Sequence, residues 1–310
     1  MEGLVWFSHM RAVCIFFTFI LFVQSDLFGQ AYRKWTSSDG REIKATFIEE
    51  NKDLVSIRGK DGRLFKIPLD KFSDADKKYI RSLSFDPLEG LVAWYPFNGN
   101  AQDESGNGHH GKVIGAKLCK DRKGKVDSAY SFDGLNDYID LGKDQKLNPR
   151  NEMTMSAWIM IDRELRSKKG NDLVRSEPII ERYQPNAGRR SYYLGILSDR
   201  KLRAAFFQDG GTPKVPRFVS SQNTSLLNLN KHYFVAVTYT YSRGGNIFLN
   251  GKIISEIKYG EPIQQTNEST CLGGILNSKS KYFTGVIDEA RIYDRALNQD
   301  EINFLYELEK

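Results

Sequence analysis

Residues 91–111 read LVAWYPFNGNAQDESGNGHHG, and the fold of the larger part of the chain follows from this stretch. Its first part, residues 91–97, is entirely apolar or aromatic and has the length of a short buried strand. The residues that follow are rich in Gly, Asn and Asp, which favour turns. We therefore expect one strand that leads into a long, tightly turned loop.

Downstream, short strands and turns continue to alternate. Asn250-Gly251 between two apolar segments is a strong hairpin signal. Asn298, followed by Glu301, is typical of the capping box that begins a helix. The pattern predicts a mainly β sandwich or jelly roll with a short C-terminal helix. The expected strands cover residues 91–97, 129–132, 138–141, 153–161, 192–197, 202–207, 232–241, 246–249, 252–257 and 284–293.

A smaller unit precedes this part and covers residues 32–83. The pairs Asp39-Gly40 and Asp61-Gly62 mark turns between short alternating strands. Ser73 and Asp76 have the spacing that begins a capped helix. Short strands, tight turns and one terminal helix predict a small SH3-like barrel.

Five segments of the larger part resemble, in order and spacing, the motifs of LamG-like jelly rolls of the concanavalin A-like lectin/glucanase superfamily. They are residues 91–111, 129–134, 155–159, 248–251 and 285–297. The resemblance covers residues 91–310, which we expect to follow a linker at residues 84–90. It implies a concanavalin A-like β jelly-roll sandwich.

The smaller unit resembles the SLA-one homology domain, an SH3-like module. The similarity rests on Trp35-Thr36, Asp39-Gly40-Arg41, Asp61-Gly62-Arg63, Ile67-Pro68-Leu69 and the helix start at residues 73–80. In the yeast adaptor that gave the family its name, this domain binds short cargo peptides. Here the resemblance implies a protein-contact role.

Residues 103–108 offer carboxylate, amide and carbonyl oxygens, which suit a hard cation such as Ca²⁺. The jelly-roll resemblance implies a structural calcium ion held by Asp103, Asn107 and Asp288. The alternative is that Asp103 and Asn107 cap turns and that Asp288 pairs with Arg291. We read His109 and His110 as loop residues, because no further soft ligand stands at a spacing that suits zinc.

Glycosidases share this fold, and their retaining mechanism needs two carboxylates about 5 Å apart on one face. Asp288 and Glu289 are adjacent and should face opposite sides of a strand. Position 291 is Arg, and Glu177 and Glu181 lack a third acid. We therefore expect a protein that is not an enzyme.

Aromatic side chains near loops can stack on sugars, and Tyr183 and Tyr282 are the candidates for such a surface, whereas Trp94 and Trp158 are expected in the core. The sequence predicts an exported, non-catalytic protein that binds carbohydrate. The alternative is a structural protein–protein adhesion or scaffold module of the cell envelope, with the SH3-like unit as its protein-binding part.

Arg11 precedes the apolar run at residues 12–23, which fits the core of a signal peptide and is short for a membrane span. We expect residues 1–31 to be a signal peptide, cleaved after Ala31 or, as second choice, after Ser25. The alternative is an uncleaved anchor, which would be the chain's one membrane contact. Secretion or location in the cell envelope follows.

Cys119 and Cys271 remain after cleavage, and they either form a disulfide or are separate buried thiols.

The net charge is +6, with basic and acidic residues interleaved along the chain. A nucleic-acid binder should show a concentrated basic stripe, so we expect no nucleic-acid partner.

Overall fold

The structure is a computed structural model, and it describes residues 32–51, 53–163, 176–184, 189–197, 199–208, 217–222, 226–258, 260–276 and 282–310. The chain divides into two compact units between Phe85 and Asp86, which lies within the expected linker. The predicted signal peptide lies outside the described residues. No helix in the described ranges is long and apolar enough to cross a membrane.

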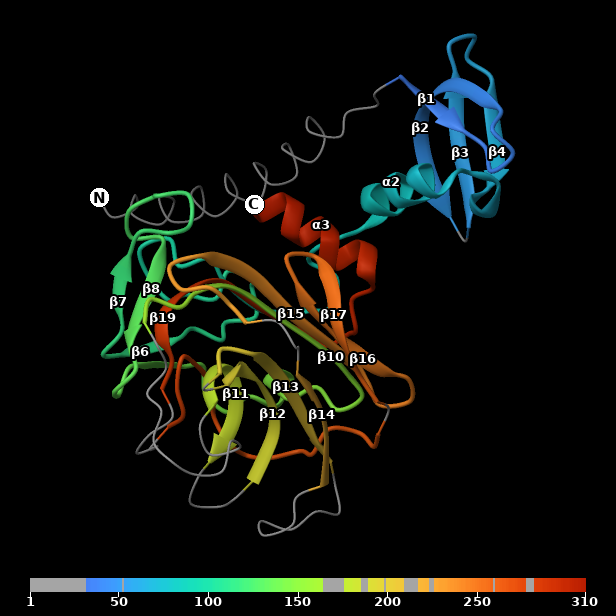
Figure 1. The fold of residues 1–310 in the computed structure, drawn as a ribbon. Coiled ribbons are helices and arrows are strands. Elements are labelled where there is room, and N and C mark those ends of the chain that lie inside the picture. The colour runs from blue at the N-terminus through green and yellow to red at the C-terminus, as the bar shows by residue number, and fades with distance from the viewer. Residues whose placement is uncertain are drawn as a thin grey trace, which may run out of the picture. The chain divides into compact units, whose positions relative to one another are not determined.

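The first unit is an antiparallel sheet followed by a helix (Figure 1). Its strands pair in the order β1 (Arg33–Thr36), β2 (Glu42–Asn51), β3 (Leu54–Gly59) and β4 (Leu64–Pro68), and the 3₁₀ helix η1 (Leu69–Lys71) and the helix α2 (Asp74–Ser84) come next. Both expected Asp-Gly turns are present, with Gly40 and Gly62 at positive φ. Ser73 caps α2 by accepting a hydrogen bond from the backbone N–H of Asp76, as predicted.

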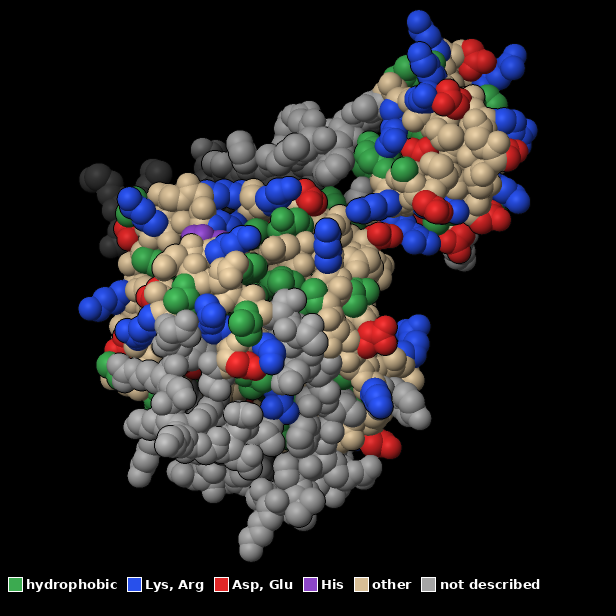
Figure 2. Space-filling model, in the orientation of Figure 1, with side chains coloured by type: hydrophobic (Ala, Val, Ile, Leu, Met, Phe, Trp, Pro, Cys, Tyr) green, Lys and Arg blue, Asp and Glu red, His purple; other side chains and the backbone are tan. Residues whose placement is uncertain are grey.

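Trp35 fills the centre of this unit. Its ring packs edge-on against Phe72 and Tyr79, and its indole N–H donates to the carbonyl of Ala45 at 2.9 Å. The Arg33 guanidinium lies over the Tyr79 ring, 3.9 Å from its centroid, and pairs with the carboxylate of Asp76 in α2. Basic and acidic side chains are interspersed over the visible face of the unit (Figure 2). Its assignment as SH3-like stays a prediction.

The second unit is a sandwich of two antiparallel sheets (Figure 1). In the described residues, the eight-stranded sheet has the order β17 (Lys252–Ile257), β16 (Gly244–Leu249), β15 (His232–Thr240), β10 (Glu152–Met160), β19 (Thr284–Tyr293), β8 (Ala129–Asp133) and β7 (Lys117–Cys119), and β5 (Leu91–Tyr95) also pairs with β19. The seven-stranded sheet has the order β14 (Arg217–Gln222), β13 (Leu202–Gln208), β12 (Arg189–Leu197), β11 (Ser176–Gln184), β18 (Thr270–Leu272), β9 (Tyr138–Asp140) and β6 (Lys112–Ile114).

The main core lies between these two sheets, because alternate residues of each strand point inward. Phe206 of β13 and Tyr239 of β15 stack across it with ring centroids 4.3 Å apart. Asn250-Gly251 forms the expected hairpin between β16 and β17, and both residues have positive φ. The predicted mainly β sandwich is confirmed.

A closing helix, α3 (Gln299–Glu309), lies on the outer face of the eight-stranded sheet (Figure 1). It begins with the capping box of Asn298 and Glu301 that the sequence predicts. Tyr306 stacks on Trp158 at 5.8 Å and packs against Phe234. Trp158 is therefore buried as expected, but beneath α3 and not between the sheets.

Candidate functional site

Asp103 folds the loop after β5 back onto that strand. Its Oδ1 accepts hydrogen bonds from the backbone N–H of Trp94 (3.0 Å) and of Ser105 (2.9 Å), and its Oδ2 accepts one from His109 (3.0 Å). Its own N–H donates to Nδ1 of His110 at 3.1 Å. Charge-assisted bonds of this kind are about twice as strong as neutral ones. Asp103 therefore fixes the path of the loop.

The side chains of Asn107 and His109 connect the loop to β5 and to the start of the next 3₁₀ helix. Nδ2 of Asn107 donates to the carbonyls of Leu91 and Val92, both at 3.0 Å. Nε2 of His109 lies 3.4 Å from Oδ2 of Asp144, which begins the 3₁₀ helix η2 (Gln145–Leu147). The turn-rich loop and η2 are thus held beside the start of β5.

A cleft of about 510 Å³ opens between these elements and the end of β19. We name it the Asn148 cleft. Leu91, Val92 and Asn148 are buried, and most of the other lining residues are partly or fully exposed. Its lining comprises Gly90, Leu91, Val92, Asn107, Gln145, Lys146, Asn148, Pro149, Arg150, Asn151, Glu152 and Asp294.

The Asn148 side chain has an unused acceptor. The residue is 2% exposed, its Nδ2 donates to the carbonyl of Gln264 at 3.4 Å, and its Oδ1 has no hydrogen-bond partner within the described chain. A buried polar atom without a partner costs about 1–3 kcal/mol. A ligand that donates a hydrogen bond to this oxygen would remove that cost.

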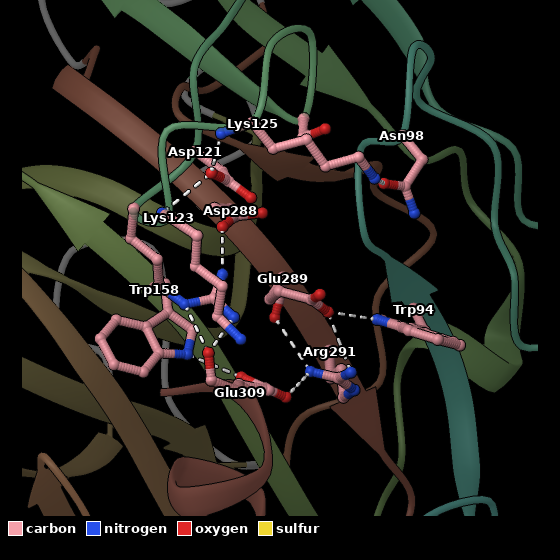
Figure 3. Close-up of polar contacts among 12 residues, drawn as sticks. Trp94, Asn98, Asp121, Lys123, Lys125, Trp158, Asp288, Glu289, Arg291 and Glu309 are labelled. Atoms are coloured by element: carbon pink, nitrogen blue, oxygen red, sulfur yellow. Dashed lines mark hydrogen bonds and ion pairs between the residues drawn. The ribbon is translucent and has the colours of Figure 1, made fainter. Parts of the chain in front are cut away.

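Asp288 lies elsewhere, in a charged cluster on the outer face of the eight-stranded sheet (Figure 3). Its Oδ2 accepts a hydrogen bond from Nη1 of Arg122. Nε of Arg122, at 2.8 Å, and Nη2 donate to the backbone carbonyl of Glu309, at the end of α3. The guanidinium also lies over the Trp158 ring, 4.7 Å from its centroid.

Arg291 joins the remaining members of this cluster (Figure 3). It donates to Oε2 of Glu289 at 2.9 Å and to Oε1 of Glu309. The indole N–H of Trp158 donates to Oε2 of Glu309, and that of Trp94 to Oε2 of Glu289, both at 2.7 Å. Each carboxylate of the cluster therefore has a donor.

Two of these carboxyl groups are difficult to ionise. Burial raises the pKa of Asp288 to about 7, helped by the nearby charge of Glu289 and opposed by Arg122. Burial also raises the pKa of Glu309 to about 7, against the opposing charge of Arg291. The cluster is a desolvated structural network, since Asp288 is 2% and Glu309 is 4% exposed.

A β-bulge explains why Asp288 and Glu289 share one side. Ser156 and Trp158 of β10 pair with Arg291 and Asp288, so one residue of β10 faces two of β19. Glu289, in the bulge, has φ of 50°. The expectation that these two acids face opposite sides is wrong, because strict alternation holds only for an unbulged strand.

The three residues expected to bind calcium do not meet. No polar contact joins Asp288 to Asp103 or Asn107 within the described ranges, and no group of three or more His, Cys, Asp or Glu side chains there could hold a metal. Asp103 is occupied by backbone N–H donors and Asp288 by Arg122, whereas Ca²⁺ needs six to eight oxygens. This arrangement does not fit one calcium site, and calcium binding stays a prediction.

Of the two tyrosines expected at the surface, Tyr183 lies in β11 and Tyr282 lies just before β19. Tyr183 is half-buried, with the Arg190 guanidinium 4.0 Å from its ring centroid. Tyr282 bridges to Gly274 and packs against Tyr138 at 6.3 Å. It is 7% exposed, so its expected surface position is wrong because this packing buries it.

Cys119 and Cys271 are separate free thiols, one in each sheet. This agrees with the alternative of separate thiols, although only Cys271 is fully buried and Cys119 is half-buried. Burial raises the pKa of Cys119 to about 11 and that of Cys271 further, so neither is a reactive thiolate at neutral pH.

Residues 132–303 match the family model of the laminin G type that is described as the concanavalin A-like lectin/glucanases superfamily. The chain belongs to the concanavalin A-like lectin/glucanases superfamily. No curated protein matches the sequence at a significant level.

Solved structures of other proteins are similar in fold to the sandwich of this superfamily member. The binding domain of Paraclostridial Mosquitocidal Protein 1 is 18% identical with a TM-score of 0.57, and it matches over 72% of this chain and 53% of its own. The botulinum neurotoxin serotype D ligand-binding domain in complex with N-acetylneuraminic acid is 16% identical with a TM-score of 0.52, over 71% and 51%. The chain thus spans about half the length of these proteins, and the likeness shows the fold.

Sequence reasoning about this superfamily member missed Arg122 and Asn148. Arg122 lies in a Lys- and Asp-rich turn that reads as solvated surface, and its partners are distant in sequence. Asn148 precedes Pro149, which signals only a turn. Neither residue carried a signal that distinguishes it from ordinary loop residues.

Proposed function

We propose that this chain is a non-catalytic glycan-binding protein and that the Asn148 cleft takes a neutral, hydroxyl-rich sugar. The observation that carries the proposal is that Asn148 lines a cleft of about 510 Å³ and has a buried Oδ1 without a hydrogen-bond partner among the described residues. A sugar hydroxyl can donate to this oxygen and accept from a neighbouring group at the same time.

The cleft lining suits a sugar better than an ion or an apolar ligand. Its amide side chains supply both donors and acceptors, and Leu91 and Val92 give a small apolar floor for the C–H groups of a ring. Two cationic residues are matched by two acidic ones, so no net charge selects an acidic ligand. They are Lys146, Arg150, Glu152 and Asp294.

The structural neighbours support glycan recognition by this fold. One is a ligand-binding domain in complex with N-acetylneuraminic acid. Another, 17% identical with a TM-score of 0.53 over 72% of this chain and 52% of its own, is described as showing that cell entry of botulinum neurotoxin type C depends on interaction with two ganglioside molecules. Both are binding proteins, which favours a binding role here.

A lack of catalysis is supported by the state of the acids around β19. A retaining glycosidase needs two carboxyl groups about 5–5.5 Å apart on either side of a bound sugar. Asp288, Glu289 and Glu309 instead contact guanidinium or indole N–H groups, and Asp288 and Glu309 are buried. Their arrangement leaves no carboxylate pair facing a ligand in this part of the sheet.

We also infer that the protein acts outside the cytoplasm, in the cell envelope or as a secreted protein. The apolar run at residues 12–23 supports this, because it has the length of a signal-peptide core. Mass determination of the mature protein from envelope and culture fractions tests it. An unprocessed chain in the cytoplasm would contradict export.

A glycan array that contains neutral and sialylated sugars tests the binding proposal with the full chain, the variant Asn148→Ala and the rim variant Asn151→Ala. Asn136→Ala, at an exposed turn that is not part of the cleft lining, is the matched control. We expect neutral glycans to bind and Asn148→Ala to weaken them about tenfold, the loss of one hydrogen bond with a buried partner.

Asn151→Ala should weaken binding without lowering the melting temperature, because Asn151 is exposed on the rim. An array without glycan hits would contradict the proposal. Equal binding by the wild-type protein and both cleft variants would place the sugar elsewhere and also contradict it.

A further inference from the structure

We infer that the Arg122 guanidinium occupies the place beside Asp288 that a metal ion would take in this jelly roll. It thereby holds helix α3 against strand β19 without a metal ion. The inference rests on the position of Arg122 and not on the proposed glycan binding. It replaces the calcium ion that the family resemblance implies at Asp288.

The contacts of Arg122 span three parts of the fold. Its Nη1 donates to Asp288 of β19, and its Nε and Nη2 donate to the carbonyl of Glu309 in α3. Its plane lies over Trp158 of β10. The Arg122 side chain is 8% exposed, so water screens these contacts little.

The loop that carries Arg122 is itself fixed. Oδ1 of Asp121 accepts hydrogen bonds from the backbone N–H of Lys123 (2.9 Å) and Lys125 (2.8 Å), which closes the turn. Nζ of Lys125 then donates to Oδ1 of Asn98 at 2.6 Å. The turn therefore presents Arg122 to Asp288 in a set geometry.

Each carboxyl group of the cluster already pairs with a guanidinium. Three carboxylates, those of Asp288, Glu289 and Glu309, face the two guanidiniums of Arg122 and Arg291. A divalent ion at Asp288 would have to displace Arg122 from a buried pair. It would also need several more oxygens than this position supplies.

Thermal unfolding and amide hydrogen exchange test the inference with the wild-type chain, Arg122→Ala and Arg122→Lys. Lys123→Ala is the matched control, because Lys123 is exposed in the same turn and only its backbone N–H is bonded within the cluster. Each protein is measured in millimolar Ca²⁺ and in EDTA.

We expect the wild-type melting temperature to change by less than about 1 °C between Ca²⁺ and EDTA, and Arg122→Ala to lower it by about 5–10 °C. Arg122→Lys should recover only part of that loss, because an ammonium lacks the planar fork that reaches two acceptors. Amides of α3 should exchange faster in Arg122→Ala, whereas those of β15 should change less.

A wild-type protein that Ca²⁺ stabilises by several degrees would overturn the inference, and so would an Arg122→Ala variant as stable as Lys123→Ala. If Arg122→Ala does not fold, the comparison of Arg122→Lys with Lys123→Ala decides: equal stability and equal α3 exchange contradict the proposed role. Glycan binding is not needed for any of these readouts, so failure here leaves the proposed function standing.

Discussion

The indole Nε1 of Trp158 lies 2.7 Å from Oε2 of Glu309, and this hydrogen bond joins the middle of the eight-stranded sheet to the last turn of α3. Glu309 is 4% exposed and also accepts from Arg291. The contacts of the Glu309 carboxyl group with Trp158 and Arg291 thus hold the end of the helix. The stacking of Tyr306 on Trp158 adds apolar contact. Stability of α3 should depend on both.

Trp158→Phe should destabilise the second unit by about 1–3 kcal/mol, because Phe keeps the aromatic packing and leaves a buried oxygen of Glu309 without its donor. Urea unfolding measures this change. Trp94→Phe is the control, since its indole bonds Glu289 at the same distance from a less buried position. A larger loss in Trp94→Phe would contradict this view of the cluster.

The free energy of unfolding should fall as the pH rises from about 5 to 7, through the titration of Glu309. Its pKa is raised from 4.5 to about 7 in the folded chain by burial, so the folded state holds the proton more tightly than the unfolded state. The groups that face it are Arg291, Glu289, Arg122 and the Trp158 indole.

Glu309→Gln removes this titration while it keeps a similar shape. The stability of the wild-type protein relative to Glu309→Gln should therefore be greatest near pH 5 and lower by on the order of 2 kcal/mol at pH 8. Denaturant unfolding at both pH values gives this difference. A difference that is constant with pH, or that grows as the pH rises, would show that Glu309 is ionised throughout.

Asp103→Asn should loosen the loop after β5 and cost about 2–4 kcal/mol, since an amide cannot accept all three backbone N–H bonds that the carboxylate accepts. Amide exchange of residues 98–111 should rise with it. Glu104→Gln, at an exposed neighbouring position, should leave both unchanged. Unchanged exchange in Asp103→Asn would refute the fixing role of Asp103.

Gly285→Ala should cost about 3 kcal/mol or more, because a Cβ at this position would lie 1.9 Å from the carbonyl oxygen of Met160 and force β19 away from β10. Gly124→Ala is the control that separates the steric clash from the cost of a positive φ. Gly124 also has positive φ, but nothing lies within 4 Å of its Cβ position. Thermal unfolding should show a clearly larger loss for Gly285→Ala. Equal losses of stability in the two variants would mean that the positive φ, and not the clash with Met160, causes the loss.

Local signals in the sequence were enough for the architecture. Asn250-Gly251 and the Asn298 cap are read from neighbouring residues, so the hairpin and the closing helix could be predicted. The bulge at Glu289 could not be, because it depends on register with β10. The role proposed for Arg122 depends on partners distant in sequence, and no spacing rule reveals them. The role proposed for Asn148 depends on a buried acceptor without a partner among the described residues, which the sequence does not reveal either.

The central claim is that the Asn148 cleft holds the sugar, and crystals soaked with a neutral oligosaccharide selected on the array test it most directly. We expect a sugar hydroxyl within hydrogen-bond distance of Oδ1 of Asn148, with the ring against Leu91 and Val92. Sugar bound instead over Tyr183 and Arg190, on the outer face of the seven-stranded sheet, or no bound sugar at saturating concentration, would contradict the claim.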